Sequence, residues 1–287
     1  MKTIILGNGF DIDLGFPTRY KDFLGSTDFL QYLYDGLTTT APNDHPSNIF
    51  KYIEKQVKED SRWTDVEYTL SEYAKQGNLY LKTRLGQKAS PNVSNQEISL
   101  SYDNLIRSLK DYLLSIQFTK LAKRSSVAYA FLKAISSYDE NDLSVLSFNY
   151  TLPKEIFPEL NIANKIENIH GDIKSNIILG FNDSGLYDST YEYMVKIKGR
   201  DSKVADVKSK IYMSDELVFF GHSLGESDRD YFQDTLRFYS KRVIFITYND
   251  ESKAAILNEL NKMGASFIIN HAEWYYTSQP SNRIIIL

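Results

Sequence analysis

The chain opens on an apolar, β-branched run that leads directly into a glycine-rich turn. Residues 3–6 read Thr-Ile-Ile-Leu, which is typical of a first buried parallel strand, and glycines after such a strand let backbone N–H groups approach a pyrophosphate. The third glycine of a G-x-G-x-x-G motif is absent, because Ile12 occupies its position. The opening therefore indicates a nucleotide site completed by distant segments. The candidate binding residues of the turn are Gly7, Asn8, Gly9, Phe10 and Asp11.

Composition limits the function classes that the chain can serve. Its 287 residues are 42% hydrophobic and 24% charged, which predicts one soluble globular domain over residues 1–287 with a sizeable core. The formal net charge is −4, so no overall basic field favours nucleic acid or an anionic membrane as a partner. Cysteine is absent, which excludes disulfides, a thiol nucleophile and Cys-ligated zinc.

No segment has the pattern of an export signal or a membrane span. The N-terminus lacks the basic segment and long apolar stretch of a signal peptide, and no run approaches the roughly 18 apolar residues that a span needs. We therefore expect a cytoplasmic location. No spacing of Asp, Glu and His argues for a metal site. The sequence leaves a homo-oligomer open.

Hydrophobic spacing divides the chain into a helical stretch and an α/β stretch. Between about residues 19 and 136 apolar residues such as Ile53 and Val57 recur at helical spacing, which predicts a large helical insertion after the first strand. Helix-compatible segments at 228–240 and 251–263 separate later strands, as in a parallel sheet covered on both faces. The predicted fold is α/β, a Rossmann-like, mostly parallel sheet. Its further strands are expected at 143–148, 166–169, 177–181, 216–220, 243–247, 266–269 and 284–287.

Three more polar clusters follow predicted strands, at 147–151, 168–172 and 221–228. Ligands of open α/β sheets bind outside the carboxyl ends of the strands, so we expect these clusters to share one crevice with the first turn. Ser227 or Asp228 is expected to cap the helix that follows the last cluster. The candidate site residues of the three clusters are Asn149, His170, Gly221, His222, Ser223 and Leu224.

Each candidate also has a purely structural interpretation. Gly9 permits close packing between a strand and a helix, and Asn149 can stabilise a crossover turn. A lone histidine such as His170 is often a hydrogen-bonded structural residue, and for His222 we favour a structural or ligand-lining role over catalysis. The Trp-Thr-Asp-Val-Glu segment at 63–67 favours a capping box with a packing tryptophan over paired catalytic carboxylates.

Taken together, the motif blocks resemble those of the bacteriophage abortive-infection AbiH family, which is itself similar to sirtuin-like NAD-binding proteins. The resemblance implies a sirtuin-like Rossmann fold in which Asn149 and His170 flank the nicotinamide ribose of NAD. It also implies that Gly7 and Gly9 hold the pyrophosphate, and that Gly221, Ser223 and Leu224 line the dinucleotide. The blocks that carry the resemblance are Gly7 to Asp11 with Pro17-Thr18, Trp63 to Glu67, Phe148 to Thr151, Ile169-His170-Gly171 and Gly221 to Asp228.

The chain departs from the sirtuin deacylases at several positions. Without cysteine it lacks their four-cysteine zinc module, which argues against a zinc-dependent deacylase. Asn8 stands where the sirtuin turn has a small residue, and Asp11 stands where it has a serine. Thr151 replaces the aspartate that follows Asn-Tyr in many sirtuin-like sites.

Two functions from different classes follow from the resemblance and the site chemistry. The first is an anti-phage NAD glycohydrolase that cleaves NAD to nicotinamide and ADP-ribose through an oxocarbenium-like state, with His170 polarising a ribose hydroxyl and Asn149 orienting water. The alternative is a non-catalytic sensor of NAD, ADP-ribose or a related nucleotide that signals to a partner through the helical insertion. Expected partners are NAD or a related nucleotide and a phage-derived trigger or protein. A nuclease ranks last, because no basic patch or metal cluster is seen.

Overall fold

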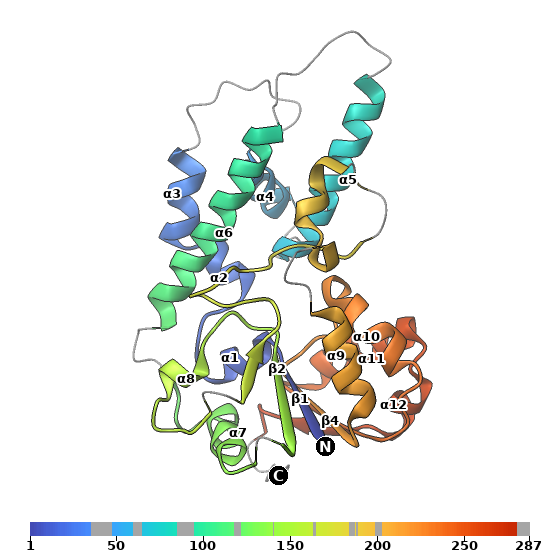
Figure 1. Ribbon diagram of the computed structural model, residues 1–287. Helices are drawn as coiled ribbons and strands as arrows, with labels where there is room; N and C mark the ends of the chain where they lie inside the picture. The colour runs from blue at the N-terminus through green and yellow to red at the C-terminus, as the bar shows by residue number, and fades with distance from the viewer. Residues whose placement is uncertain are drawn as a thin grey trace. The chain divides into compact units, whose positions relative to one another are not determined.

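The chain divides into two compact units (Figure 1). The first comprises Met1–Thr18, Ile116–Ile177 and Asp201–Leu287, and the second comprises Arg19–Ser115 and Ile178–Arg200. The computed structural model describes residues 1–35, 48–59, 65–84, 95–117, 122–139, 141–162, 165–183, 187, 189–198 and 203–279. Within these residues every strand belongs to the first unit.

A six-stranded sheet forms the centre of the first unit, and its described strands all pair in parallel. Ile4 of the central strand pairs with Val145 on one side and with Val218 on the other. This confirms the predicted α/β fold with a parallel sheet. In spatial order the strands are β3 (Ile166–Asn168), β2 (Leu143–Ser147), β1 (Lys2–Leu6), β4 (Glu216–Phe220), β5 (Arg242–Thr247) and β6 (Glu273–Tyr276).

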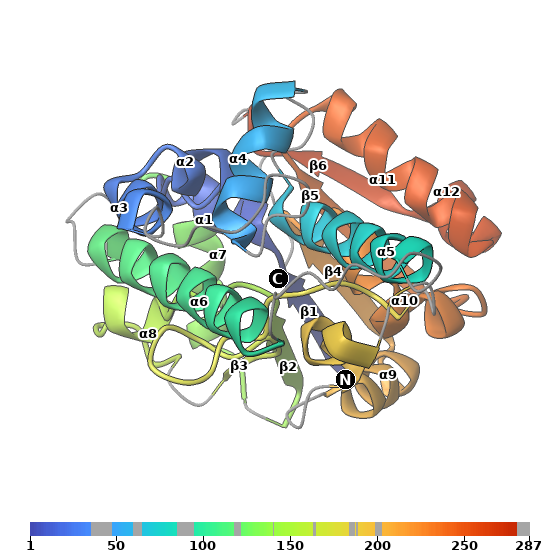
Figure 2. The same ribbon diagram turned by 90° about the horizontal axis from the view of Figure 1, so that it is seen from above.

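Alternating side chains of the strands fill two cores, one on each face of the sheet. Ile4 and Leu6 belong to the core under α1 and α7, whereas Ile5 belongs to the core under α9 to α12 (Figure 2). Both faces are buried, which explains why the strands read as continuous apolar runs. The helices of this unit are α1 (Asn8–Asp13), α7 (Val127–Ser136), α8 (Pro153–Ile156), α9 (Val204–Met213), η5 (Glu226–Asp228), α10 (Arg229–Leu236), α11 (Asp250–Met263) and α12 (Ser266–His271).

Helices make up most of the described residues of the second unit. Ile53 and Val57, which predicted a helix by their spacing, lie on α4. The short helix η3 packs on α5, where the rings of Tyr73 and Tyr191 meet edge to face with centroids 5.7 Å apart. The helices are α2 (Tyr20–Leu24), α3 (Thr27–Asp35), α4 (Ile49–Glu59), α5 (Val66–Arg84), α6 (Asn95–Gln117), η3 (Ser189–Met194) and η4 (Lys196–Lys198).

Two of the predicted strands are wrong. The segment 266–269 lies in α12, where burial of Ala265 and Ile268 follows helical spacing, and the next strand is β6, which the sequence pattern did not reveal. A four-residue apolar run is too short for its period to distinguish helix from strand. The segment 177–181 is extended but forms only the isolated bridge of Phe181 with Val195 in the described residues. The predicted strand 284–287 lies outside the described residues.

A buried ion pair joins two separate segments of the second unit. Lys196 Nζ lies 2.8 Å from Glu67 Oε1, and the two side chains are 1% and 9% exposed. Asp65 precedes α5 and caps its N-terminus, because its Oδ1 accepts hydrogen bonds from the backbone N–H groups of Glu67 and Tyr68. The predicted helix start at this motif is therefore made by Asp65, while Glu67 pairs with Lys196. Trp63 lies outside the described residues.

We predict that removing one partner of the Lys196–Glu67 pair lowers the free energy of unfolding more than removing both partners does. Lys196→Met removes the cation beside a buried carboxylate and should lower the free energy of unfolding by about 3–5 kcal/mol. Adding Glu67→Leu should recover most of that loss, since a buried pair can be replaced by apolar side chains at little cost. Urea denaturation measures both changes. Lys58→Met at the exposed pair with Glu54 is the control and should change little. A double variant as unstable as the sum of the single variants would contradict the prediction.

Candidate functional site

The segments that follow β1, β2 and β4 meet at the carboxyl edge of the sheet. The N–H of Gly9 donates to the carbonyl of Gly221 at 2.9 Å, and the N–H of Gly7 donates to Phe220 at the same distance. Asn149 Nδ2 donates to the carbonyl of Gly7 at 3.0 Å. The turn after the first strand is thus fixed to both neighbouring strand ends.

The glycines of these turns allow backbone to pack on backbone. A Cβ at Gly9 would lie 2.7 Å from the Cα of Gly221, and one at Gly7 would lie 2.5 Å from the Cα of His222. Gly221 itself has φ of +63°, a conformation that side chains disfavour. These contacts are the close packing that the structural interpretation of Gly9 expects. The N–H groups of Gly7 and Gly9 are both engaged by protein carbonyls.

Asn149 is held on two sides. Its side chain is turned to Gly7, and its backbone carbonyl accepts a hydrogen bond from Asn168 Nδ2 at 2.7 Å. Asn168 Nδ2 also reaches the carbonyl of Thr151 at 3.1 Å, so the end of β3 braces the turn after β2. Asn149 is buried. Sequence reasoning named the cluster that contains Asn168 but missed this bracing role.

His170 follows β3 and is buried among aromatic rings. Its ring centroid lies 5.0 Å from that of Phe148 and 5.5 Å from that of Tyr231. His170 Nε2 lies 3.4 Å from Asp228 Oδ1, and His222 Nε2 lies 3.5 Å from Asp228 Oδ2. Two imidazoles therefore face the two oxygens of one carboxylate.

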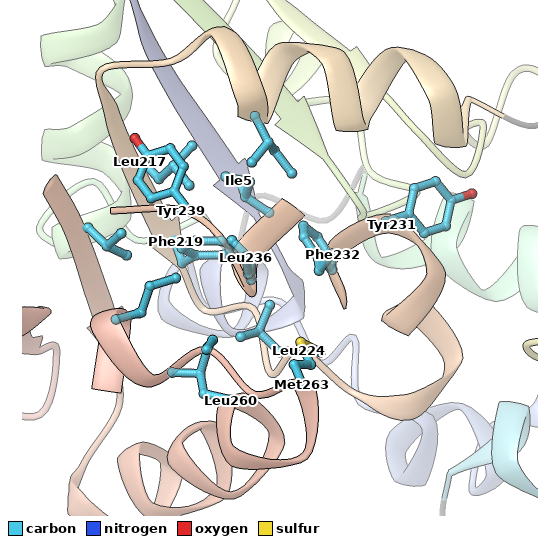
Figure 3. Packing of buried hydrophobic residues seen from close by; sticks show 14 of the residues in the cluster. Ile5, Leu217, Phe219, Leu224, Tyr231, Phe232, Leu236, Tyr239, Leu260 and Met263 are labelled. Carbon is cyan, nitrogen blue, oxygen red and sulfur yellow. The ribbon is translucent and has the colours of Figure 1, made fainter. Parts of the chain in front are cut away.

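His222 supports the local backbone of its own turn. Its Nδ1 accepts a hydrogen bond from the N–H of Leu224 at 3.0 Å. Leu224 has φ of 55°, in the left-handed region, and its side chain is fully buried in the core shown with Leu260 and Met263 in Figure 3. This contact supports the structural interpretation of His222, because it stabilises a backbone conformation that leucine rarely adopts.

The remaining candidates differ in exposure. Phe10 is fully buried and packs edge to face on Phe220 with ring centroids 5.2 Å apart, so it belongs to the core. Asn8 and Ser223 are exposed. Asn8 Nδ2 donates to the carbonyl of Thr18 at 3.1 Å, which ties the turn to the end of the next loop.

Asp11 is a buried carboxyl group that bridges the turns after β1 and β2. Thr151 Oγ1 lies 3.1 Å and 2.9 Å from its two oxygens. Burial raises the pKa of Asp11 from 3.8 to about 7, and hydrogen bonds from Thr151 and Asn149 act in the opposite direction. Asp11 therefore changes its charge near neutral pH, next to the Asn149 amide.

Asp228 was assigned from sequence to the start of a helix, and the structure places it there. It occupies the N-terminal cap position of α10, yet its side chain makes no capping hydrogen bond. The carboxylate is instead turned to the two histidines. The sequence signal was present in the polar cluster 221–228, but capping propensity alone could not indicate this contact.

Two features are absent from the part of the chain that the structure describes. No group of three or more His, Asp or Glu side chains there has the geometry of a metal site. Similarly, none of the described helices has the length and apolar character that crossing a membrane requires.

The raised pKa of Asp11 predicts a pH-dependent stability. The folded state binds this proton more tightly than the unfolded chain, so the contribution of Asp11 to the free energy of unfolding is highest below pH 4 and falls until about pH 7. Asp11→Asn removes this titrating group. The free energy of unfolding of the variant, measured relative to that of the parent, should therefore increase by about 3 kcal/mol from pH 5 to pH 8. Urea denaturation at the two pH values measures this difference. Exposed Asp142→Asn is the control, and an Asp11→Asn difference independent of pH would contradict the account.

Comparisons with known proteins agree with the motif blocks. A sequence model of the family described as bacteriophage abortive infection AbiH matches residues 3–250, a range that contains the first turn and all three polar clusters. Comparison with curated proteins and with solved structures finds no match. Because the matched range spans most of its 287 residues, the chain belongs to the bacteriophage abortive infection AbiH family.

Proposed function

We propose that this protein acts in abortive infection as an NAD glycohydrolase, cleaving NAD to nicotinamide and ADP-ribose at the carboxyl edge of its sheet. The observation that carries the proposal is the position of Asn149 and His170. They follow the neighbouring strands β2 and β3, and Asn149 is hydrogen-bonded to the turn after β1. The strand order 3-2-1-4-5-6 supports it, because Rossmann folds with this order bind dinucleotides where the order reverses. The resemblance to sirtuin-like proteins favours NAD as that dinucleotide.

The chemistry requires few protein groups. Nicotinamide leaves as a neutral molecule from a pyridinium, so the enzyme must stabilise an oxocarbenium-like ribose and deliver one water to C1′. The amide nitrogen of Asn149 is turned to Gly7 and Asp11, which leaves Oδ1 as the atom that accepts a hydrogen bond from that water. His170 takes the proton of a ribose hydroxyl and thereby stabilises the developing positive charge.

Removing either proposed side chain should abolish most turnover. We expect His170→Ala and Asn149→Ala each to lower NAD turnover by about 10²-fold or more, the scale of losing a positioned acid–base group. The measurement is chromatographic detection of nicotinamide and ADP-ribose, with thermal unfolding as the check on folding. The matched controls are His271→Ala and Asn258→Ala at exposed positions of α12 and α11. Turnover that survives in both site variants would show that these residues are not the catalytic ones.

A sensor is the second candidate function, and one observation favours it. The N–H groups of Gly7 and Gly9 and the amide of Asn149 are all engaged by protein acceptors. A pyrophosphate that used these donors would have to displace protein contacts. Such a displacement changes the conformation of the turns when the ligand binds, and a partner of a sensor recognises a change of this kind. A parent protein that binds NAD or ADP-ribose, yet releases no nicotinamide under any activating condition, would favour this function.

A substitution at Gly9 distinguishes a structural role of this residue from a role in nucleotide binding. We expect Gly9→Val to lower the unfolding temperature, because its Cβ would lie 2.7 Å from the Cα of Gly221, and nucleotide binding should be lost together with stability. Thermal unfolding with and without NAD measures both effects. Gly25→Val is the control, since the nearest atoms to its Cβ are 3.7 Å away. A Gly9 variant with parental stability and lost binding would instead assign Gly9 to direct approach of the ligand.

A further inference from the structure

We propose that Asp228 is a positioning residue that fixes the tautomer of His170 through a carboxylate shared with His222. The proposal rests on the proposed function, because it explains how His170 is prepared as a base. It starts from the geometry in which His170 Nε2 faces Asp228 Oδ1 and His222 Nε2 faces Asp228 Oδ2.

A carboxylate only accepts hydrogen bonds, so an imidazole nitrogen that faces it must carry a proton. For His222 a second contact fixes the same tautomer, because Nδ1 accepts the N–H of Leu224 and the proton must therefore sit on Nε2. In this tautomer an Nε2–H group of each imidazole is directed towards one oxygen of Asp228. The N–O distances of 3.4 and 3.5 Å exceed those of well-formed hydrogen bonds, and catalytic contacts of this kind commonly tighten when substrate binds.

The surroundings of this arrangement are aromatic and mostly buried. The ring of Phe148 stands edge to face against both imidazoles, with centroids 5.0 Å from His170 and 4.8 Å from His222. Both histidines are buried, and the Asp228 side chain is 15% exposed. In such an environment the orientation of a ring is set by few contacts, and each electrostatic contact is stronger than in water.

The two ring nitrogens of His170 therefore have different roles. With Nε2 protonated towards Asp228, Nδ1 is the atom that takes the proton of the ribose hydroxyl. The imidazolium that forms then lies beside the Asp228 carboxylate, which stabilises its positive charge. Asp228 acts here through His170 and does not touch the substrate.

Asp228→Asn separates positioning from helix capping, because asparagine and aspartate are equally good at the cap position. The amide offers one acceptor and one donor, so it can satisfy only one Nε2–H group. His222 is held by Leu224, so the amide oxygen should turn to His222 and the amide NH₂ group to His170. His170 should then shift its proton to Nδ1.

The direct readout is the tautomer of each ring, measured by long-range ¹H–¹⁵N correlation spectroscopy on the full chain. The chain has four histidines, and the signals of interest are assigned with His170→Gln and His222→Gln. We expect Nε2–H at both rings in the parent. In Asp228→Asn we expect Nδ1–H at His170 and unchanged Nε2–H at His222. Asp234→Asn, which removes a carboxylate that is 74% exposed on α10, should change neither ring.

The activity readout is kept separate from the tautomer readout. We expect Asp228→Asn to lower kcat for NAD by about 10²-fold or more with a much smaller change in KM, because the tautomer matters for the chemical step. A parent protein with Nδ1–H at His170, or an Asp228→Asn variant in which His170 keeps Nε2–H, would overturn the proposal even if NAD is cleaved. The expected tautomer shift in a protein that cleaves no NAD would uphold the positioning and reject the glycohydrolase.

Discussion

The candidate site depends on the close backbone packing of the turn after β1 on the turn after β4. Gly9 and Gly221 approach so closely that neither position has space for a Cβ, and the N–H of Gly9 donates to the carbonyl of Gly221. This contact joins the start of α1 to the end of β4, next to the parallel pairing of β1 with β4. Asn149 then reaches Gly7, and Asp11 reaches Thr151, across 142 and 140 positions of the sequence.

Buried polar groups gather at this edge although burial of each of them is costly. Asp11, Asn149, His170 and His222 are all buried. Hydrogen bonds offset the desolvation of Asp11, Asn149 and His222, and His170 Nε2 lies 3.4 Å from the Asp228 carboxylate. The arrangement is costly to maintain for packing alone, because apolar side chains would fill the same space without the need for partners. Perturbed titratable groups held in this way are typical of functional sites, and the raised pKa of Asp11 fits that pattern.

The sequence predicted the strands in the middle of the sheet and the edge strand β3, and it failed at the opposite edge. β1, β2, β4 and β5 are buried on both faces and therefore read as apolar runs bounded by polar turns. β6 is an edge strand whose residues Glu273 to Tyr276 are only partly buried, and its pattern carries no such signal. The run at 266–269 was read as a strand, but it forms a short helix instead.

The sequence indicated where the site lies, but it did not indicate which side chains contact one another there. Polar clusters after apolar strands indicated the correct edge, since that inference needs only the strand pattern. The sharing of Asp228 by His170 and His222 depends on how the segment after β3 packs against the segment after β4, and no local pattern encodes it. For the same reason, the pairing of Glu67 with Lys196 could not be foreseen from the motif at 63–67.

The NAD content of infected cells tests the central claim most directly. Cells that express the parent or His170→Ala at equal levels are infected with a phage that the parent blocks, and NAD, nicotinamide and ADP-ribose are quantified over time. The account predicts that NAD falls while nicotinamide and ADP-ribose rise in parent cells only. Unchanged NAD in parent cells that still block the phage, or an equal fall in both strains, would contradict it.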